Sequence, residues 1–361
     1  MSFLRLLLFP FSLIFWVVSS LYHWLYNLGI LRSRSFAIPI ISVGNLTTGG
    51  TGKTPHVAYI IRLLLRDEQG FFDRVATLSR GYGRVTSGFR LVDHEATAVE
   101  VGDEPRMLKQ RFNNIFVAVD ENRAHGIDKL LSMVPGLNVI LLDDAFQHRR
   151  VKPGLSILLH DFQGVSKAKM MLPAGDLREP VKGARRADII VVTNSPNMLS
   201  PHERRRVIKI IKPMDSQQVY FSYVGYHDFV PLVGKTTKEK ASKDYYFKKN
   251  YAILLITGIA DPEPLKEYYS KEVSELVHIS FSDHHEFTLE DIRKVQKKFD
   301  NIVNENKIIL TTEKDAMRLI IPGVAKELQD LPVFYLPINI RFHGNDAENF
   351  NKQILNYVTK D

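Results

Sequence analysis

The chain contains no cysteine among its 361 residues. Disulfides, zinc–thiolate sites and cysteine nucleophiles are therefore excluded. Internal repeats and low-complexity tracts are also absent, and an apolar share of 45% with a charged share of 24% is ordinary for a folded chain. These features exclude a disordered, collagen-like or coiled-coil protein. Because the length exceeds what one hydrophobic core usually supports, we expect two globular units.

Lysine, arginine, aspartate and glutamate are missing from residues 6–31, a stretch that lies between Arg5 and Arg32. A spanning helix needs about 20 apolar residues, and Trp16 and Trp24 are of the kind that favours the headgroup layer. Three interpretations compete: a cleaved signal peptide, a core helix, and a membrane anchor that spans the bilayer or lies in its interface. We favour the anchor, because a nucleotide-binding motif follows shortly after Arg32 and nucleotide chemistry belongs in the cytosol.

The charge balance favours an anionic partner. Lysine and arginine total 48 and aspartate and glutamate total 40, so the formal net charge is +8. Charge alone does not separate nucleic acid from phospholipid or a phosphorylated substrate. No nucleic-acid module with interleaved aromatics is recognisable, so we expect no nucleic acid. Anionic lipids and substrate phosphate remain as the expected partners.

A glycine-rich loop carries the strongest functional signal. Residues 36–43 form an apolar strand pattern that runs directly into residues 44–54 (GNLTTGGTGKT), and Pro55 suits the first turn of a helix. Glycines in such a loop let backbone N–H groups face phosphate oxygens, Lys53 would reach the β- and γ-phosphates, and Thr54 would face Mg²⁺. Thr47 stands where glycine is usual. The expected nucleotide-binding residues are Thr47, Gly49, Gly50, Thr51, Gly52, Lys53 and Thr54.

Short apolar runs alternate with helical patterns along the rest of the chain, which is typical of a parallel sheet covered on both faces. The predicted strands are residues 75–78, 115–119, 139–142, 156–159, 189–192, 252–257, 276–280, 307–311 and 333–336, and a helix is predicted over 289–299. The expected fold is α/β, with a P-loop NTPase-type parallel sheet core, a smaller C-terminal α/β domain and an N-terminal membrane-associated helix. The predicted boundaries are 1–34 for the anchor, 35–225 for the P-loop core and 226–361 for the C-terminal domain that closes over the cleft.

Three acidic or histidine-rich motifs add candidate chemistry. Asp143 and Asp144 end an apolar strand, a position from which carboxylates hold Mg²⁺ opposite a phosphate-binding loop. Asp103 is a candidate general base, or simply the N-cap of a helix. The string SDHHE at 282–286 permits three interpretations: a zinc site, a histidine that shares a proton with a carboxylate, or a structural turn.

Taken together, these motifs resemble the tetraacyldisaccharide 4'-kinase family, the lipid A 4'-kinases of Gram-negative bacteria. The resemblance rests on GNLTTGGTGKTP (44–55), RGYG (80–83), GDEP (102–105), DDAFQHR (143–149), LPAGDLREP (172–180) and FSDHHEF (281–287), which occur in family order over most of the chain. It implies ATP-dependent phosphorylation of the 4'-hydroxyl of an acylated glucosamine disaccharide 1-phosphate. It also implies a location on the cytoplasmic face of the inner membrane. We predict no required protein partner.

By the same resemblance, Asp103 matches the proposed base and His284 the histidine that pairs with it, while the choice between His284 and His285 rests on motif alignment. Arg123 matches a basic residue near the transferred phosphate. Asp143 and Asp144 match the family's acidic metal-site motif, and Glu104 is the neighbour of the proposed base. The predicted Mg²⁺ ligands are Thr54, Asp143, Asp144 and Glu104.

Three positions depart from the family pattern. Ala145 and Asn194 stand where glycine and lysine are expected, and Asp176 lies in LPAGDLREP. Ala145 should keep the turn unless its φ angle is positive.

The alternative function is a membrane-tethered P-loop GTPase or ATPase switch that acts through partner binding. Its guanine-reading motif has only a poorly spaced counterpart at 312–315. A third possibility is a membrane-surface scaffold, which leaves the loop at 49–54 unexplained.

Overall fold

The computed structural model describes residues 7–66, 73–167, 169–232 and 242–359. The chain divides into two compact units. Unit 1 contains Met1–Glu95, Leu108–Val224 and Ile340–Asp361, and unit 2 contains Ala96–Met107 and Gly225–Asn339. Each unit has its own sheet, so the prediction of an α/β chain with a large and a smaller sheet is confirmed.

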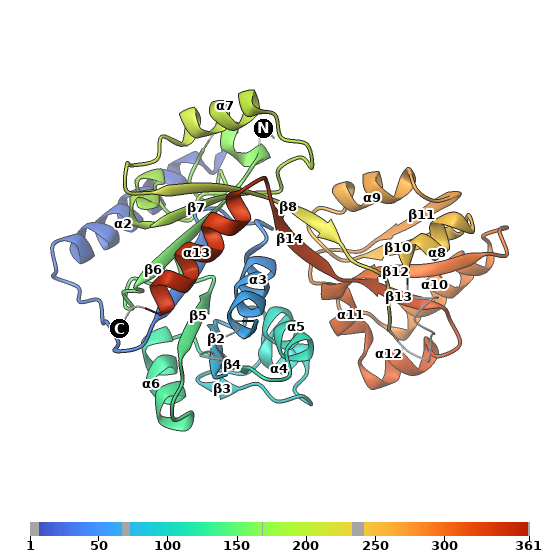
Figure 1. Ribbon diagram of the computed structural model, residues 1–361. Helices are drawn as coiled ribbons and strands as arrows, with labels where there is room; N and C mark the ends of the chain where they lie inside the picture. The colour runs from blue at the N-terminus through green and yellow to red at the C-terminus, as the bar shows by residue number, and fades with distance from the viewer. Residues whose placement is uncertain (1–6, 67–72, 168, 233–241, 360–361) are drawn as a thin grey trace. The chain divides into compact units, whose positions relative to one another are not determined.

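Unit 1 is built on a nine-stranded sheet in the order β14-β8-β7-β6-β1-β5-β2-β4-β3 (Figure 1). Neighbouring strands from β8 to β4 are parallel, and β3 is antiparallel to β4. The strands are β1 (Ile40–Asn45), β2 (Val75–Ser79), β3 (Arg90–Leu91), β4 (Phe116–Val119), β5 (Val139–Asp143), β6 (Leu155–Asp161), β7 (Ile189–Thr193), β8 (Gln218–Tyr226) and β14 (Ile338–Phe342). The strand β1 begins at Ile40 and not at residue 36, because Pro39 has no N–H to donate to a ladder.

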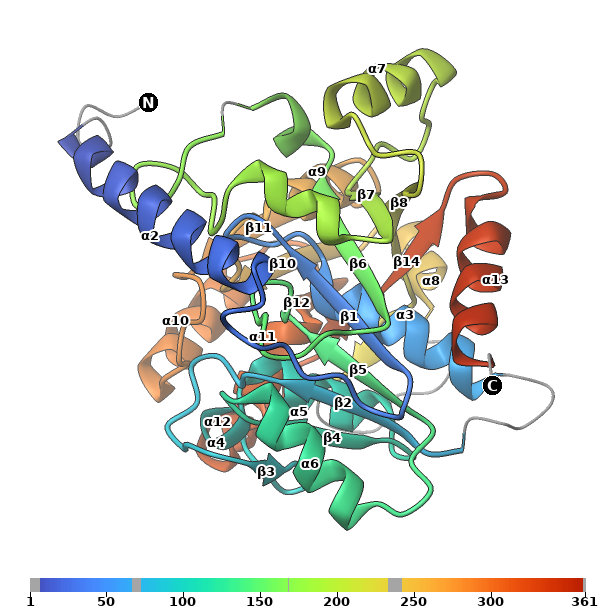
Figure 2. The same cartoon turned by 90° about the vertical axis from the view of Figure 1, so that its left-hand side faces the viewer.

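Helices pack on this sheet through their apolar residues. Ile127 and Leu130 of α6 pack in one core cluster with Ile40, Leu78 and Leu142 of three strands. The helix α3 contacts β1, β2 and β5, and α13 lies beside α3 (Figure 2). The helices of unit 1 are α2 (Phe9–Asn27), α3 (Lys53–Leu65), α6 (Arg123–Met133), α7 (Pro201–Ile211) and α13 (Asp346–Val358), with 3-10 helices η1 (Gln163–Ser166) and η2 (Val181–Arg186).

The C-terminal segment belongs to unit 1, which differs from the predicted domain 226–361. The ring of Phe342 lies 5.1 Å from that of Tyr59 on α3, and the Tyr59 hydroxyl donates to Asn351 at 2.9 Å. Asp346 accepts from the backbone N–H of Phe221 at 2.8 Å. Residues 96–107, predicted within the P-loop core, belong to unit 2. A linear division of the sequence misses both exchanges, because they depend on contacts between distant segments.

Unit 2 contains a five-stranded sheet in the order β11-β10-β12-β13-β9, parallel except for β9. The strands are β9 (Val230–Pro231), β10 (Ala252–Thr257), β11 (Glu275–Ser280), β12 (Lys307–Thr312) and β13 (Val333–Leu336). The helices are α4 (Ala98–Val101), α8 (Lys243–Lys248), α9 (Glu263–Ser270), α10 (Leu289–Asp300), α11 (Glu313–Leu319) and α12 (Pro322–Glu327), and α5 (Asp103–Arg111) begins here. The strands predicted from 75 to 336 and the helix near 289–299 are therefore present.

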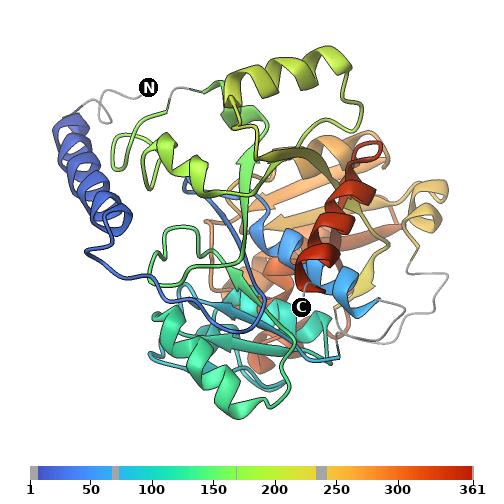
Figure 3. The same ribbon diagram turned by 60° about the vertical axis from the view of Figure 1, so that its left-hand side comes forward.

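The helix α2 occupies most of the predicted anchor, of which residues 1–6 lie outside the described residues. Figure 3 shows it at the edge of unit 1, in blue. Ser12 and Tyr26 are its buried residues, and the Ser12 hydroxyl accepts from the Ala174 N–H at 2.9 Å. The exposed large side chains on this helix include Phe11, Leu13, Ile14, Trp16, Val17, Val18, Leu21 and Trp24. None of the helices described combines the length and apolar character that crossing a bilayer requires.

Candidate active site

The glycine-rich loop joins β1 to α3. Gly49 has a φ angle of 109° and Gly52 one of 76°, a region that side chains with a Cβ rarely adopt. Gly52 is the N-cap of α3, and Lys53 is the first residue of the helix. The first N–H groups of a helix have no partner within it and attract anions. The predicted order of strand, loop and helix is therefore present. We expect the backbone N–H groups at the start of α3 to be available as hydrogen-bond donors.

Three threonines of the loop, Thr47, Thr48 and Thr51, are held by neighbouring segments. The side-chain amide of Asn45 donates to the Thr51 hydroxyl at 2.8 Å. Thr47 forms an antiparallel bridge with Leu177, and the Thr48 N–H donates to the Asp176 carbonyl at 2.7 Å. The LPAGDLREP segment thus pairs with the loop through its backbone, which is the role the structure shows for Asp176.

Thr54 and Asp143 form a buried hydrogen-bonded pair of side chains. The Thr54 hydroxyl donates to Asp143 Oδ2 at 3.1 Å, and the two residues are 7% and 3% exposed. Asp143 ends β5, where it is the register partner of Val43 on β1. Because parallel strands end at the same edge of the sheet, the carboxylate and the start of α3 come together.

Asp144 is surrounded by cations. Arg178 Nη1 donates to both of its carboxylate oxygens at 2.9 Å, whereas Lys53 Nζ lies 3.8 Å from Oδ1. The φ angle of Asp144 is 50°, a left-handed conformation that turns the chain sharply after β5. Ala145 is not among the described residues with positive φ, so alanine fits this turn.

Arg123 begins α6 and is 3% exposed. Its guanidinium donates to the backbone carbonyls of Asp120 at 3.1 Å and Asp144 at 3.4 Å. Burial lowers the pKa of Arg123 to about 10, although nearby carboxylates, Asp144 first, act in the opposite direction. Arg123 therefore joins the group formed by Lys53 and Asp144 in unit 1.

Asn194 also lies beside the loop. Its φ angle is 54°, a conformation that asparagine tolerates better than lysine. The side-chain amide donates to Asp161 Oδ1 at 3.0 Å and to the Gly50 carbonyl at 3.5 Å. The departure from lysine at this position thus places a short side chain against the loop backbone.

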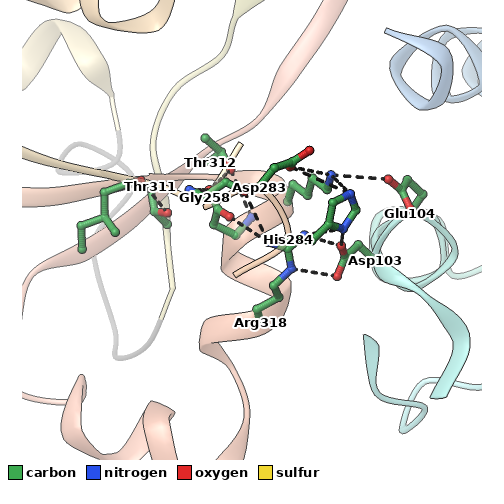
Figure 4. A network of polar contacts seen from close by, with 11 residues as sticks. Asp103, Glu104, Gly258, Asp283, His284, Thr311, Thr312 and Arg318 are labelled. Atoms are coloured by element: carbon green, nitrogen blue, oxygen red, sulfur yellow. Dashed lines mark hydrogen bonds and ion pairs between the residues drawn. The ribbon is translucent and has the colours of Figure 1, made fainter. Parts of the chain in front are cut away.

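In unit 2, the structure brings Asp103 and His284 together across 181 positions of sequence (Figure 4). His284 Nδ1 lies 2.9 Å from Asp103 Oδ2, and His284 has a φ angle of 60°. His285 instead contacts Asp291 Oδ2 at 3.0 Å and stacks on Phe281. The two histidines have separate partners, and His284 is the one that contacts Asp103.

Asp103 has a second partner, Arg318, whose Nε donates to Oδ1 at 3.0 Å and whose Nη2 donates to Oδ2. Burial would raise the pKa of Asp103, but the hydrogen bonds from His284 and Arg318 prevail and lower it to about 2. Lys314 Nζ lies 2.9 Å from His284 Nε2. Asp103 is therefore an ionised carboxylate in a buried network.

Glu104 lies in the same cluster, with Oε1 3.7 Å from Lys314 Nζ. Within the described ranges, no group of three or more histidine, aspartate or glutamate side chains is arranged to hold a metal ion. The zinc interpretation of residues 282–286 therefore has no support in the geometry. The sequence prediction of Glu104 as a metal ligand stays a prediction.

Sequence reasoning missed three residues of these groups: Arg178, Lys314 and Arg318. Arg178 lies in LPAGDLREP, so the motif was visible although its partner Asp144 was not. Lys314 and Arg318 lie in TEKDAMR, where the first four residues resemble a guanine-reading motif with poor spacing. In the structure, Thr312 of this string caps α11 by accepting from the Asp315 N–H.

A family model described as tetraacyldisaccharide-1-P 4'-kinase, LpxK, matches residues 4–359. The chain belongs to this family. Two relatives, both named tetraacyldisaccharide 4'-kinase, are each 42% identical to this chain. The relative from Bacteroides thetaiotaomicron aligns over 98% of this chain and 93% of its own length, and that from Flavobacterium johnsoniae over 100% and 99%.

A solved structure also matches: the "apo" form of LpxK from Aquifex aeolicus in complex with ATP. It has a TM-score of 0.72 and 27% identity, and the match covers 98% of this chain and 99% of that one. Membership of the LpxK family confirms the predicted resemblance and the predicted enzyme class, a lipid kinase of lipid A biosynthesis.

Proposed function

We propose that this LpxK family member transfers the γ-phosphoryl group of ATP to the 4'-hydroxyl of an acylated glucosamine disaccharide 1-phosphate. The observation that carries the proposal is the Thr54–Asp143 pair beside Lys53, at the end of a glycine-rich loop of P-loop NTPase type. The relatives' names support the acceptor, and the ATP complex of a 27% identical relative supports the donor.

Unit 1 would bind the nucleotide. Lys53 is only loosely paired with Asp144 at 3.8 Å, so its ammonium is available to the β- and γ-phosphates. Backbone N–H groups of the loop and the start of α3 would donate to phosphate oxygens. The nucleotide-binding residues proposed are Thr47, Gly49, Gly50, Thr51, Gly52, Lys53 and Thr54.

The Thr54 hydroxyl and the Asp143 carboxylate fit Mg²⁺, which prefers oxygen ligands and usually takes only one or two from protein beside substrate phosphates and water. Bound Mg²⁺ supplies neutralisation of the charge that develops on the phosphates. Asp144 and Glu104 are further proposed ligands. Both now lie near cations, Asp144 near Arg178 and Glu104 near Lys314, so metal binding there requires the cations to move.

Arg123 would stabilise the transferred phosphoryl group. Its guanidinium is buried and already aimed at the turn that carries Asp144. A fixed cation in a site that excludes water stabilises transition-state charge without reorganising. In this proposal, Arg123 and Lys53 share the charge of the transferring group.

Unit 2 would accept the proton. Asp103 is proposed as the base and His284 as the residue that holds it. A carboxylate with a pKa of about 2 is a weak base, but phosphoryl transfer passes through a loose transition state in which orienting the hydroxyl matters more than removing its proton early.

The helix α2 would hold the enzyme on the cytoplasmic face of the inner membrane. Most of its large apolar side chains are exposed, and the aromatic residues Trp16, Tyr22 and Trp24 suit the headgroup layer. The net charge of +8 favours anionic lipids. If α2 anchors the protein, carbonate-washed membranes should retain the full chain and release a variant that lacks residues 1–34; equal release of both would contradict the anchor.

The decisive experiment is phosphate transfer from γ-labelled ATP to purified tetraacyldisaccharide 1-phosphate in mixed micelles with Mg²⁺. We expect label in the lipid at the 4' position and ADP in equal amount. The alternative, a GTPase or ATPase switch, predicts nucleotide hydrolysis without labelled lipid and, for the GTPase, competition by GTP over ATP. A scaffold without nucleotide chemistry would show neither product.

A further inference from the structure

Arg318 on α11 makes a two-point contact with Asp103. Its Nε donates to Oδ1 at 3.0 Å and its Nη2 donates to Oδ2, so the guanidinium meets both oxygens (Figure 4). The two side chains are 5% and 10% exposed. The planar guanidinium matches the carboxylate plane and fixes its rotation, which a lysine ammonium does not do.

Arg318 is itself fixed by a second carboxylate. Its Nη1 donates to Asp315 Oδ1 at 3.3 Å, and Asp315 is fully buried. The other oxygen of Asp315 accepts from the Gly258 N–H at 2.9 Å and from the Thr312 hydroxyl at 2.7 Å. Turning Arg318 away would leave the buried Asp315 without its cation, which is costly. The orientation of Arg318 is therefore built into unit 2.

Lys314 occupies the other side of the histidine. Its ammonium lies 2.9 Å from His284 Nε2, 3.6 Å from Asp283 and 3.7 Å from Glu104. An ammonium only donates, so His284 Nε2 accepts. The proton of the imidazole is then on Nδ1, which donates to Asp103 Oδ2. Arg318 Nη2 also lies 3.1 Å from Nδ1, but because a guanidinium only donates, this contact adds no hydrogen bond to the protonated Nδ1.

The hydrogen bonds that Asp103 accepts can be compared with the number of its acceptor positions. An ionised carboxylate offers about four acceptor positions, two on each oxygen. Among the described residues, Oδ2 accepts from Arg318 Nη2 and His284 Nδ1, and Oδ1 accepts from Arg318 Nε. One position on Oδ1 remains for a hydroxyl group.

We propose that Arg318 and Lys314 are positioning residues for the transfer: Arg318 presents Asp103 Oδ1 to the acceptor hydroxyl, and Lys314 keeps His284 Nε2 from accepting the proton instead. The inference rests on the proposed function. The 4'-oxygen bonds to the γ-phosphorus, the bond from that phosphorus to the β–γ bridging oxygen breaks, ADP leaves, and the hydroxyl proton passes to Asp103 Oδ1.

The first test is Arg318→Lys, which keeps the charge and removes the two-point contact. We expect kcat to fall about 100-fold with the KM for ATP within about twofold, because orientation of the acceptor is lost and nucleotide binding is not. Arg204→Lys is the matched control, since Arg204 contacts Asp346 through two bonds of 2.8 Å in unit 1. The control should lower Tm and leave kcat unchanged. If Arg318→Lys also lowers only Tm, Arg318 is structural and the proposal fails.

A double-mutant cycle separates action through Asp103 from an independent role. Asp103→Asn combined with Arg318→Lys should be no slower than Asp103→Asn alone, because Arg318 has nothing left to orient. Multiplied losses would overturn the proposal. If Asp103→Asn keeps full kcat while Arg318→Lys loses it, the base assignment of the proposed function fails instead.

Lys314→Met provides a second route should Arg318→Lys not fold, because the Lys314 side chain is partly exposed. We expect kcat to fall about tenfold in Lys314→Met. The double variant Lys314→Met/His284→Ala should have the same kcat as His284→Ala alone, because Lys314 acts through His284. An unchanged kcat in a folded Lys314→Met would contradict the role of Lys314.

Discussion

The two groups of predicted site residues are built differently. In unit 1, the loop presents backbone through Gly49 and Gly52, and Lys53 forms a long ion pair of 3.8 Å with Asp144. In unit 2, Asp103 is enclosed by side chains, with Arg318 and His284 on its two oxygens. The first group thus consists of donors suited to an anion. In the second group, side-chain contacts already fix the orientation of the carboxylate.

This difference indicates a division of labour. A site made of backbone donors and one loosely held lysine gains most of its order from the phosphate that it binds. A carboxylate fixed by an arginine and a histidine is oriented before any substrate arrives. We therefore expect substitutions in the loop to affect nucleotide affinity and rate together, and those at Asp103 to affect rate alone.

The largest expected effect is that of Lys53→Ala. Removing the cation that meets the transferring phosphate should lower kcat/KM for ATP by about 10³-fold and weaken ATP binding as well. Lys209→Ala on α7, which lies on the protein surface, is the control. Steady-state kinetics and equilibrium ATP binding would measure the two losses. Normal ATP affinity in Lys53→Ala would contradict the proposed difference between the two groups.

A smaller effect is expected from Thr54. Thr54→Ala removes the hydroxyl proposed for Mg²⁺, and the Mg²⁺ concentration for half-maximal activity should rise about 10- to 100-fold. Thr54→Ser keeps the hydroxyl and should remain close to the parent protein. Titration of activity with Mg²⁺ at saturating ATP measures this, and equal behaviour of the two variants would remove Thr54 from the metal site.

The units should also differ in their response to acid. Burial lowers the pKa of His56 in unit 1 to about 4, while the Gly52 carbonyl opposes this only partly. The unfolded chain, with an ordinary histidine pKa near 6.5, binds the proton first, so stability is lost as pH falls from about 6.5 to about 4. The loss for His56 is about 3 kcal/mol. His160 has its pKa lowered to about 4 in the same unit, mainly by burial.

In unit 2, Asp291 behaves in the opposite range. Burial would raise its pKa, but hydrogen bonds from His285 and Thr288 lower it to about 2. The stabilisation is therefore complete above about pH 4, the ordinary value for aspartate, and is lost as pH falls towards 2. Burial also lowers the pKa of His278 in unit 2, so hydrogen exchange followed by unit should show unit 1 losing more protection than unit 2 between pH 6 and pH 4. Equal loss of protection in the two units would contradict this prediction.

Local patterns in the sequence predicted elements whose signals are local. Residues close in sequence specify the strands β5 and β10 through their apolar runs. The same holds for the loop before Lys53, which its glycines specify. The exchange of residues 96–107 and 340–361 between units was not predictable in this way, because it depends on packing such as Phe342 against Tyr59. A contiguous division at residue 226 has no means of detecting it.

The candidate site likewise combines residues with local sequence signals and contacts that depend on residues far apart in sequence. The Asp103–His284 pair came from a resemblance and not from spacing, since 181 positions separate the two residues. Arg318 had no signal of its own and Arg178 had only its place in LPAGDLREP, because an ion pair is visible only when both partners are placed. The choice between His284 and His285 likewise needed the structure, which gives His285 a different carboxylate, Asp291.

Nucleotide binding and proton acceptance are proposed for different residues, Lys53 with its loop and Asp103. Asp103→Asn tests this assignment directly, through kcat for lipid phosphorylation and the Kd for ATP measured on the same preparation. We predict a fall in kcat of about 10²- to 10⁴-fold with a Kd for ATP within about twofold of the parent protein. Equal losses in kcat and ATP affinity, or an unchanged kcat, would contradict the assignment.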